Sequence, residues 1–156
     1  MLDDLPDDAF EPYLERSITR FAASFPADVM SQEEILPAAR RHIEGLLPQG
    51  RQTRGQHFHR IVVDGDPVGT LWWAEQLDET PPRVYVYDIE VDEEHRGKGV
   101  GTAAMQALEE EARRLGAKEV MLSVFFKNPG AIRLYERLGF RPSETGKAGM
   151  RMAKPL

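Results

Sequence analysis

The stretch DIEVDEEHRGKGVGT, residues 88–102, decides how the chain is organised. Before it, Val84 to Val91 are rich in β-branched and aromatic side chains, which predicts a strand. After it, apolar residues at helical spacing predict a helix from about Gly99 to Leu115. Glycines between strand and helix let backbone amides turn toward an anion, and the helix start adds partial positive charge. With Arg96 and Lys98 as charged donors, the stretch predicts a pyrophosphate site; the alternative is a glycine-rich turn with surface bases.

Two nucleotide-binding motifs do not fit this loop. A P-loop needs glycine where Asp92 stands and Ser or Thr where Gly99 stands. The dinucleotide fingerprint needs glycine where Thr102 stands, and it opens a first βαβ unit rather than following a hairpin. The loop therefore belongs to neither class of nucleotide site.

A third pattern fits in two separate places. The first place is the loop motif Arg96-x-x-Gly99-x-Gly101, which follows the strand end Ile89-Glu90-Val91. The second place lies downstream and comprises Asn128, Ala131 and the run LYERLGF at residues 134–140. Because both motifs occur at the right separation, the chain resembles the GNAT superfamily of N-acetyltransferases over about residues 57–141.

This resemblance implies an α/β fold of the α+β kind, with a mixed, mostly antiparallel central sheet flanked by helices. The end of the strand would meet the acetyl and pantetheine groups of acetyl-CoA, and the loop amides would hold its pyrophosphate. Asn128 would bond the pantetheine, and Tyr135 would lie near the thioester sulfur. The full implied acetyl-CoA set is Ile89, Glu90, Val91, Arg96, Gly97, Lys98, Gly99, Val100, Gly101, Thr102, Asn128, Ala131 and Tyr135.

The chain departs from the family pattern at two points. Only Leu2 to Leu5 precede the first helical pattern, so the family's first strand is short or absent. Some members carry a carboxylate base in the middle of the strand before Asn128, where this chain has Ser123. If the enzyme uses a general base, that base therefore lies elsewhere.

Acetyl transfer to an amine requires a base for the incoming ammonium and an acid for the leaving thiolate. The reference pKa values are ~10.4 for an alkyl ammonium and ~8.5 for a thiol. A phenol, with a pKa of ~10, suits the acid. Tyr135 is the candidate acid; the alternative is a core tyrosine, because Ile132, Tyr135 and Leu138 share a helix face.

The candidate base lies on the strand before the loop. Strict alternation divides its side chains between two faces: Val84, Val86, Asp88 and Glu90 on one, and Tyr85, Tyr87, Ile89 and Val91 on the other. Glu90 is the candidate base, directly or through a water, and Asp88 would attract a cationic substrate. The alternative is that both carboxylates are merely solvated. Trp72 is a candidate wall of the acceptor cleft, with core packing as its alternative.

Charge is concentrated beside the same loop. The net charge is -6, and residues 75–94 hold eight carboxylates and one base, which sum to -7. This favours a cationic substrate and argues against a nucleic-acid surface, although a solvated acidic loop is the alternative. The chain has no cysteine and its four histidines show no metal spacing, so we expect no metal. No apolar run nears the ~20 residues of a membrane span, and a cytoplasmic location is expected.

The remaining patterns predict one domain over residues 1–156. Residues 1–50 read as a helical acceptor-side region, and residues 57–141 as the acetyl-CoA-binding core. The other predicted elements are a capping box at Ser31, strands at Phe58–Val63 and Val68–Ala74 around a turn, a strand at Val120–Phe125, a short helix opened by Asn128, and a last strand at Met150–Met152.

The resemblance implies an acetyl-CoA-dependent N-acetyltransferase with direct transfer of the acetyl group, and the charge pattern favours a small cationic primary amine as the acceptor. Two alternatives stay open: a protein amino terminus or lysine as the acceptor, and a regulatory module that binds acyl-CoA without chemistry. A homodimer is also left open.

Overall fold

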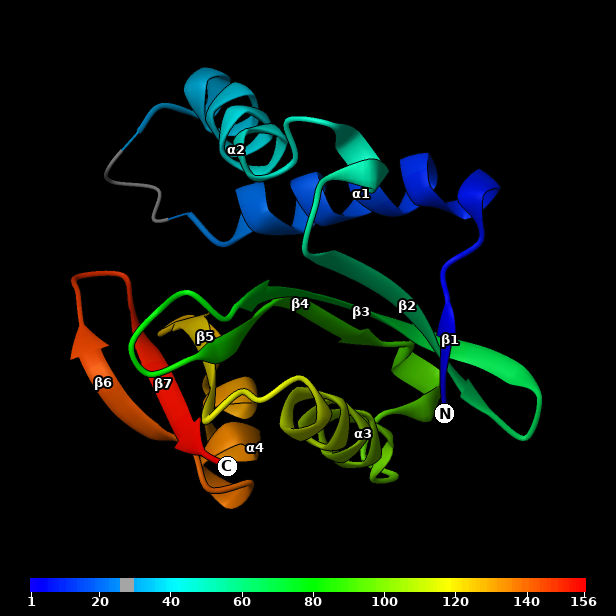
Figure 1. The fold of residues 1–156 in the computed structure, drawn as a ribbon. Coiled ribbons are helices and arrows are strands. Elements are labelled where there is room, and N and C mark those ends of the chain that lie inside the picture. The colour runs from blue at the N-terminus through cyan, green and yellow to red at the C-terminus, as the bar shows by residue number, and fades with distance from the viewer. Residues whose placement is uncertain (26–29) are drawn as a thin grey trace. The chain divides into compact units, whose positions relative to one another are not determined.

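The computed structural model describes residues 1–25 and 30–156. The chain forms two compact units, one of Met1–Leu5 with Gly55–Leu156 and one of Pro6–Arg54 (Figure 1). In the described residues, no helix is long and apolar enough to cross a membrane. The helices and strands, in chain order, are β1 (Leu2–Asp4), α1 (Asp7–Ala23), α2 (Gln32–Leu46), β2 (Gln56–Val63), β3 (Asp66–Gln76), β4 (Arg83–Val91), α3 (Val100–Arg114), β5 (Glu119–Phe125), α4 (Pro129–Arg137), β6 (Arg141–Thr145) and β7 (Gly149–Pro155).

The first unit is built on a seven-stranded sheet in the order β1-β2-β3-β4-β5-β7-β6. Antiparallel pairing joins neighbouring strands, except that β4 and β5 run parallel. A parallel pair needs a crossover connection, and α3 supplies it. The predicted mixed, mostly antiparallel sheet is therefore confirmed.

The core of this unit lies between the sheet and the helices α3 and α4, which cover the same face (Figure 1). On α3, apolar side chains four residues apart point inward. They are Val100, Ala104, Leu108 and Ala112, and all four are buried. The sheet contributes buried side chains from its inner strands, among them Leu71, Trp73, Val86 and Leu122.

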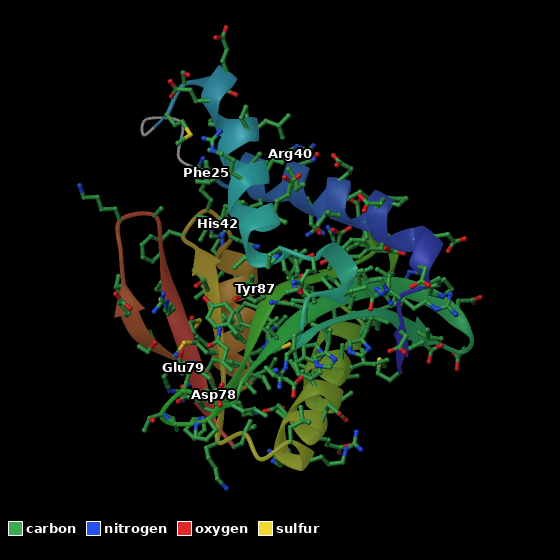
Figure 2. All side chains as sticks on the ribbon, turned by 45° about the horizontal axis from the view of Figure 1, so that its top comes forward. Phe25, Arg40, His42, Asp78, Glu79 and Tyr87 are labelled. Atoms are coloured by element: carbon green, nitrogen blue, oxygen red, sulfur yellow. The ribbon has the colours of Figure 1, made fainter. Side chains whose placement is uncertain are left out.

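The second unit pairs α1 with α2. The predicted capping box is present, because Ser31 and Glu34 satisfy each other's backbone amides at the start of α2. Arg40, on α2 (Figure 2), donates hydrogen bonds from Nη1 and Nη2 to the Glu15 carboxylate of α1 at 2.8 and 2.7 Å. These hydrogen bonds lower the pKa of Glu15 and tie the two helices together.

Three strands differ from the sequence prediction. The doubtful first strand exists as β1, three residues long, and pairs with β2. The last strand is longer than Met150–Met152 and runs as Gly149–Pro155. Before it lies β6, which the sequence did not predict. All five residues of β6 are exposed, so it has no alternating apolar pattern, and it forms only by pairing with β7.

Candidate active site

A β-bulge in β4 changes which side chains share a face. Trp72 pairs with Asp88 and Trp73 with Val86, so Tyr87 is the extra residue. Beyond the bulge, Ile89 turns to the core face. The predicted faces of this strand are therefore wrong: Val84, Val86, Ile89 and Val91 face the core, and Tyr85, Tyr87, Asp88 and Glu90 face away from it. Strict alternation fails because a bulge shifts the phase by one residue.

The bulge coincides with a split between the two parallel strands. The β4–β5 ladder runs from Arg83 opposite Glu119 to Val86 opposite Leu122. Both strands continue beyond it, β4 to Val91 and β5 to Phe125. The β4–β5 ladder therefore ends before residues 89–91. These are the residues that the family resemblance places against the acetyl and pantetheine groups, and their contacts with acetyl-CoA stay a prediction.

The glycine loop leads from the end of β4 into α3. Gly97 and Gly99 have positive φ angles of 72° and 80°, and Gly99 is the N-cap residue of α3. The amides at the start of a helix have no intrahelical partner, so residues 100–102 present theirs outward. Arg96 closes the loop by donating from Nε to the Val91 carbonyl oxygen at 2.8 Å. Exposed Lys98 adds positive charge, so the loop fits a pyrophosphate.

Helix α4 brings the downstream motif to the same place. The Asn128 side-chain oxygen accepts a hydrogen bond from the Ala131 amide at 3.2 Å and caps the helix as predicted. A Cβ on Gly101 would lie 3.6 Å from Leu134 and 3.9 Å from Val91. The start of α3, helix α4 and the end of β4 therefore converge, although their residues are far apart in the sequence.

Tyr135 lies inside this convergence and is only 8% exposed. Its ring belongs to the core cluster and packs edge-on against Phe140, with centroids 5.8 Å apart. Burial, with a smaller contribution from the charge of Asp88, raises the pKa of Tyr135 to about 12. The hydroxyl therefore stays protonated at neutral pH, as an acid must. Tyr135 is thus a core residue, and its catalytic role stays a prediction.

The two candidate carboxylates, Asp88 and Glu90, are half-buried neighbours on the face away from the core. The same face carries Trp72, which is 2% exposed and donates from its indole nitrogen to Gln56 at 2.7 Å. The Trp72 ring also packs at 5.0 Å from Tyr87, which is labelled in Figure 2. These three predicted residues are brought together, and their roles toward a substrate stay predictions.

One contact was missed by the sequence reasoning. The hydroxyl of Tyr85, which lies within the β4–β5 ladder, hydrogen-bonds the hydroxyl of Ser123, the first residue of β5 beyond it. Ser123 is the residue that stands where some family members carry a base, so a hydroxyl pair occupies this position. No local signal could reveal it, because the two residues are 38 positions apart. In the described residues, no group of three or more His, Cys, Asp or Glu side chains could hold a metal.

Residues 14–140 match the acetyltransferase (GNAT) family. The chain belongs to this family. The N-acetyltransferase YdgE of Bacillus subtilis, itself uncharacterized, is 29% identical over 157 residues, covering 99% of this chain and 97% of that protein. The crystal structure of YycN from the same organism has a TM-score of 0.88 at 28% identity, covering 95% of this chain and 96% of that chain.

A more distant structure shares the fold alone. PaiA N-acetyltransferase from Thermoplasma acidophilum, crystallised with coenzyme A, has a TM-score of 0.74 at 18% identity, covering 100% of this chain and 98% of that chain. The family assignment confirms the resemblance read from the two motifs. The protein is an N-acetyltransferase that uses acetyl-CoA.

Gly69 of β3 tests the geometry of the split. A Cβ on Gly69 would collide with the Glu90 carbonyl oxygen of β4, so Gly69→Ala must displace the backbone of residues 89–91. We expect a loss of about 1–3 kcal/mol of stability, as overpacking costs, and weaker CoA binding. Gly45→Ala in α2 is the control, since a Cβ there meets nothing within 4 Å and should stabilise by about 0.5–1 kcal/mol. Thermal unfolding measures the stability of each variant, and a CoA titration measures its affinity for CoA. Equal stability and equal CoA affinity of the two variants would contradict the expectation.

Proposed function

We propose that the protein transfers the acetyl group directly to the primary amine of a small molecule, and that this amine arrives as an ammonium cation. The observation that supports this most is the position of Asp88 and Glu90, which are neighbours on the face away from the core, just beyond the end of the β4–β5 ladder. The surrounding residues 75–94 carry a charge of -7, which extends the attraction beyond these two groups. An ammonium group would therefore be drawn to the place where the acetyl group is held.

Each proposed role follows from the groups around the split. Acetyl-CoA supplies the acetyl group as a thioester. Glu90, directly or through a water, accepts a proton from the ammonium, and the freed nitrogen bonds to the acetyl carbon as the carbon–sulfur bond breaks. Tyr135 donates its hydroxyl proton to the sulfur that leaves. The nitrogen bonded to the acetyl carbon loses its second proton to water, and the Tyr135 phenolate takes a proton back from water, so the products are the amide and the CoA thiol. Asp88 holds the ammonium beside Glu90 before that proton is lost.

The high pKa of Tyr135 has a consequence for the pH profile. A group with a pKa of about 12 is still protonated at pH 10. Ionisation of Tyr135 should therefore add no descending limb to kcat/KM below about pH 11. The ascending limb should instead report the loss of a proton from the amine.

A screen of acceptors tests the proposal itself. Amines, amino acids, peptides and anionic acceptors would be offered with acetyl-CoA, and the release of the CoA thiol would be followed. We expect turnover with primary amines that are protonated in solution. Anionic acceptors without an amine that outperform every amine would contradict the electrostatic argument.

Glu90→Gln tests the base. We expect kcat/KM at neutral pH to fall by about 10²-fold, because general-base catalysis contributes about 10²–10⁴-fold, with the loss shrinking as pH rises. Free amine becomes abundant at high pH and no longer needs the base. Glu93→Gln, which removes the same charge from an exposed site nearby, is the control and should change the rate less than about 3-fold. An unchanged profile of Glu90→Gln across pH would remove Glu90 from the mechanism.

A further inference from the structure

A cavity with a volume of about 280 Å³ lies on the sheet next to the split. It begins on β5 at Ser123, directly after Leu122, where the ladder with β4 ends. From there it extends over β7 and β6. The residues that line it are Ser123, Val124, Phe125, Glu144, Gly146, Gly149, Met150 and Arg151.

Three polar side chains form a row across this cavity. Ser123 pairs with Arg151, and Arg151 pairs with Glu144, so all three point to the same face of the sheet. Their face is the one away from the core, because the neighbouring Leu122 and Met152 point into the core. The row therefore presents a hydroxyl, a guanidinium and a carboxylate side by side.

The guanidinium of Arg151 is available to a ligand. It contacts Glu144 at 3.3 Å, and the side chains are 54% and 71% exposed. Ion pairs between exposed groups contribute about 0–1 kcal/mol, so a better-placed carboxylate can replace Glu144. A guanidinium has five N–H donors in a planar fork, which binds a carboxylate through two parallel hydrogen bonds.

The cavity and the proposed catalytic groups share one continuous face. Tyr85 hydrogen-bonds Ser123, and its ring lies 4.8 Å from that of Tyr87, next to the Asp88 and Glu90 carboxylates. Paired strands lie about 4.8 Å apart, so β4 and β7 are separated by about 10 Å across β5 where the β4–β5 ladder ends, and by more beyond the split. The face thus carries negative charge on β4 and a guanidinium two strands away.

We propose that this cavity binds a carboxylate at the far end of the acceptor, and that Arg151 is the residue that selects it. The proposal rests on the proposed function, since the amine end must still reach the split beside Asp88 and Glu90. The substrate class is then a primary amine with a carboxylate several bonds away, such as an ω-amino acid or a short peptide. A diamine of the same length gains less, because its second ammonium would lie beside the like charge of Arg151 and cannot accept the two parallel hydrogen bonds that the guanidinium donates to a carboxylate.

Acceptors that differ only at the far end separate these classes. Monoamines, aminocarboxylates and diamines with three to seven carbons would be compared by kcat/KM in the wild-type protein and in Arg151→Gln. We expect the wild-type protein to prefer the aminocarboxylate of the best length by about 10- to 100-fold over the matched monoamine, as a charged hydrogen bond allows. In Arg151→Gln this preference should vanish through KM, while the monoamine changes less than about 3-fold.

Two control variants define what the loss means. Arg113→Gln, at an exposed position near the end of α3, removes the same charge away from the cavity and should keep the preference. Glu144→Gln frees the guanidinium and should strengthen the preference. Thermal unfolding of each variant shows that the fold is retained.

The outcomes distinguish this proposal from the one before it. If amines are acetylated with no preference for a carboxylate, or diamines are preferred, Arg151 does not select the acceptor and only this inference is overturned. The same holds if Arg151→Gln lowers kcat/KM equally for all three classes. If no amine of any class is acetylated while CoA still binds, both proposals are overturned.

Discussion

Replacing Tyr135 by phenylalanine is expected to lower kcat by about 10²–10⁴-fold, the range that general-acid catalysis contributes. The change removes only the hydroxyl, while the ring keeps its edge-on contact with Phe140 and its place in the core. CoA binding and thermal unfolding should therefore stay close to those of the wild-type protein. Steady-state kinetics with acetyl-CoA measure the loss of kcat, and a CoA titration of each protein shows whether CoA binding is unchanged.

A change of leaving group sharpens this test. An acetyl thioester of a more acidic thiol needs less help from an acid, because its thiolate leaves more readily. If Tyr135 is the acid, Tyr135→Phe should lose much less activity with such a donor than with acetyl-CoA. An equal loss with both donors would show a packing role, and wild-type turnover with acetyl-CoA would remove Tyr135 from the mechanism.

The second large effect concerns an ion pair that no sequence pattern indicated. Glu109 of α3 is 4% exposed and forms an ion pair with Lys154 of β7. Lys154→Met would leave the carboxylate buried without its cation, which costs about 3–5 kcal/mol. We expect the low end, about 3 kcal/mol, because the Lys154 side chain retains 23% exposure. Chemical denaturation of the purified variant measures the loss.

The partner residue supplies the control. The double variant Glu109→Leu with Lys154→Met replaces both charges by apolar groups, and such replacements of buried pairs are often neutral or stabilising. It should recover most of the lost stability. Lys118→Met changes an exposed lysine and should alter stability by less than about 0.5 kcal/mol. A double variant as unstable as Lys154→Met would show that the lysine stem, not the charge pair, matters.

The binding loop could be predicted from the sequence because the interactions that shape it are between residues close together in the chain. Gly97 and Gly99 adopt positive φ angles, which the absence of a Cβ permits, and both are visible in the sequence. The helix caps at Ser31 and Asn128 are local as well, because each side-chain oxygen accepts a hydrogen bond from the backbone amide three residues further along the chain. Motifs of this kind, at the right separation, were sufficient to predict the family and the sheet.

The face of β4 could not be read in this way. The bulge at Tyr87 depends on how β3 and β4 pair, and an alternating pattern carries no mark of one extra residue. The prediction was wrong about which residues accompany Asp88 and Glu90: their face is aromatic, with Tyr85 and Tyr87, rather than shared with Val84 and Val86. The carboxylates themselves remain neighbours because the bulge lies before both of them.

The sequence by itself determined the family, the sheet class, the glycine loop and the candidate acid, because each rests on residues close together in the chain or on two motifs at a known separation. Only the tertiary structure decided the side-chain faces beyond the bulge, the Tyr85–Ser123 hydrogen bond and the row from Ser123 to Glu144. Those features join strands that are distant in the sequence. Their register is fixed by sheet pairing and core packing, which act between residues that no local pattern connects.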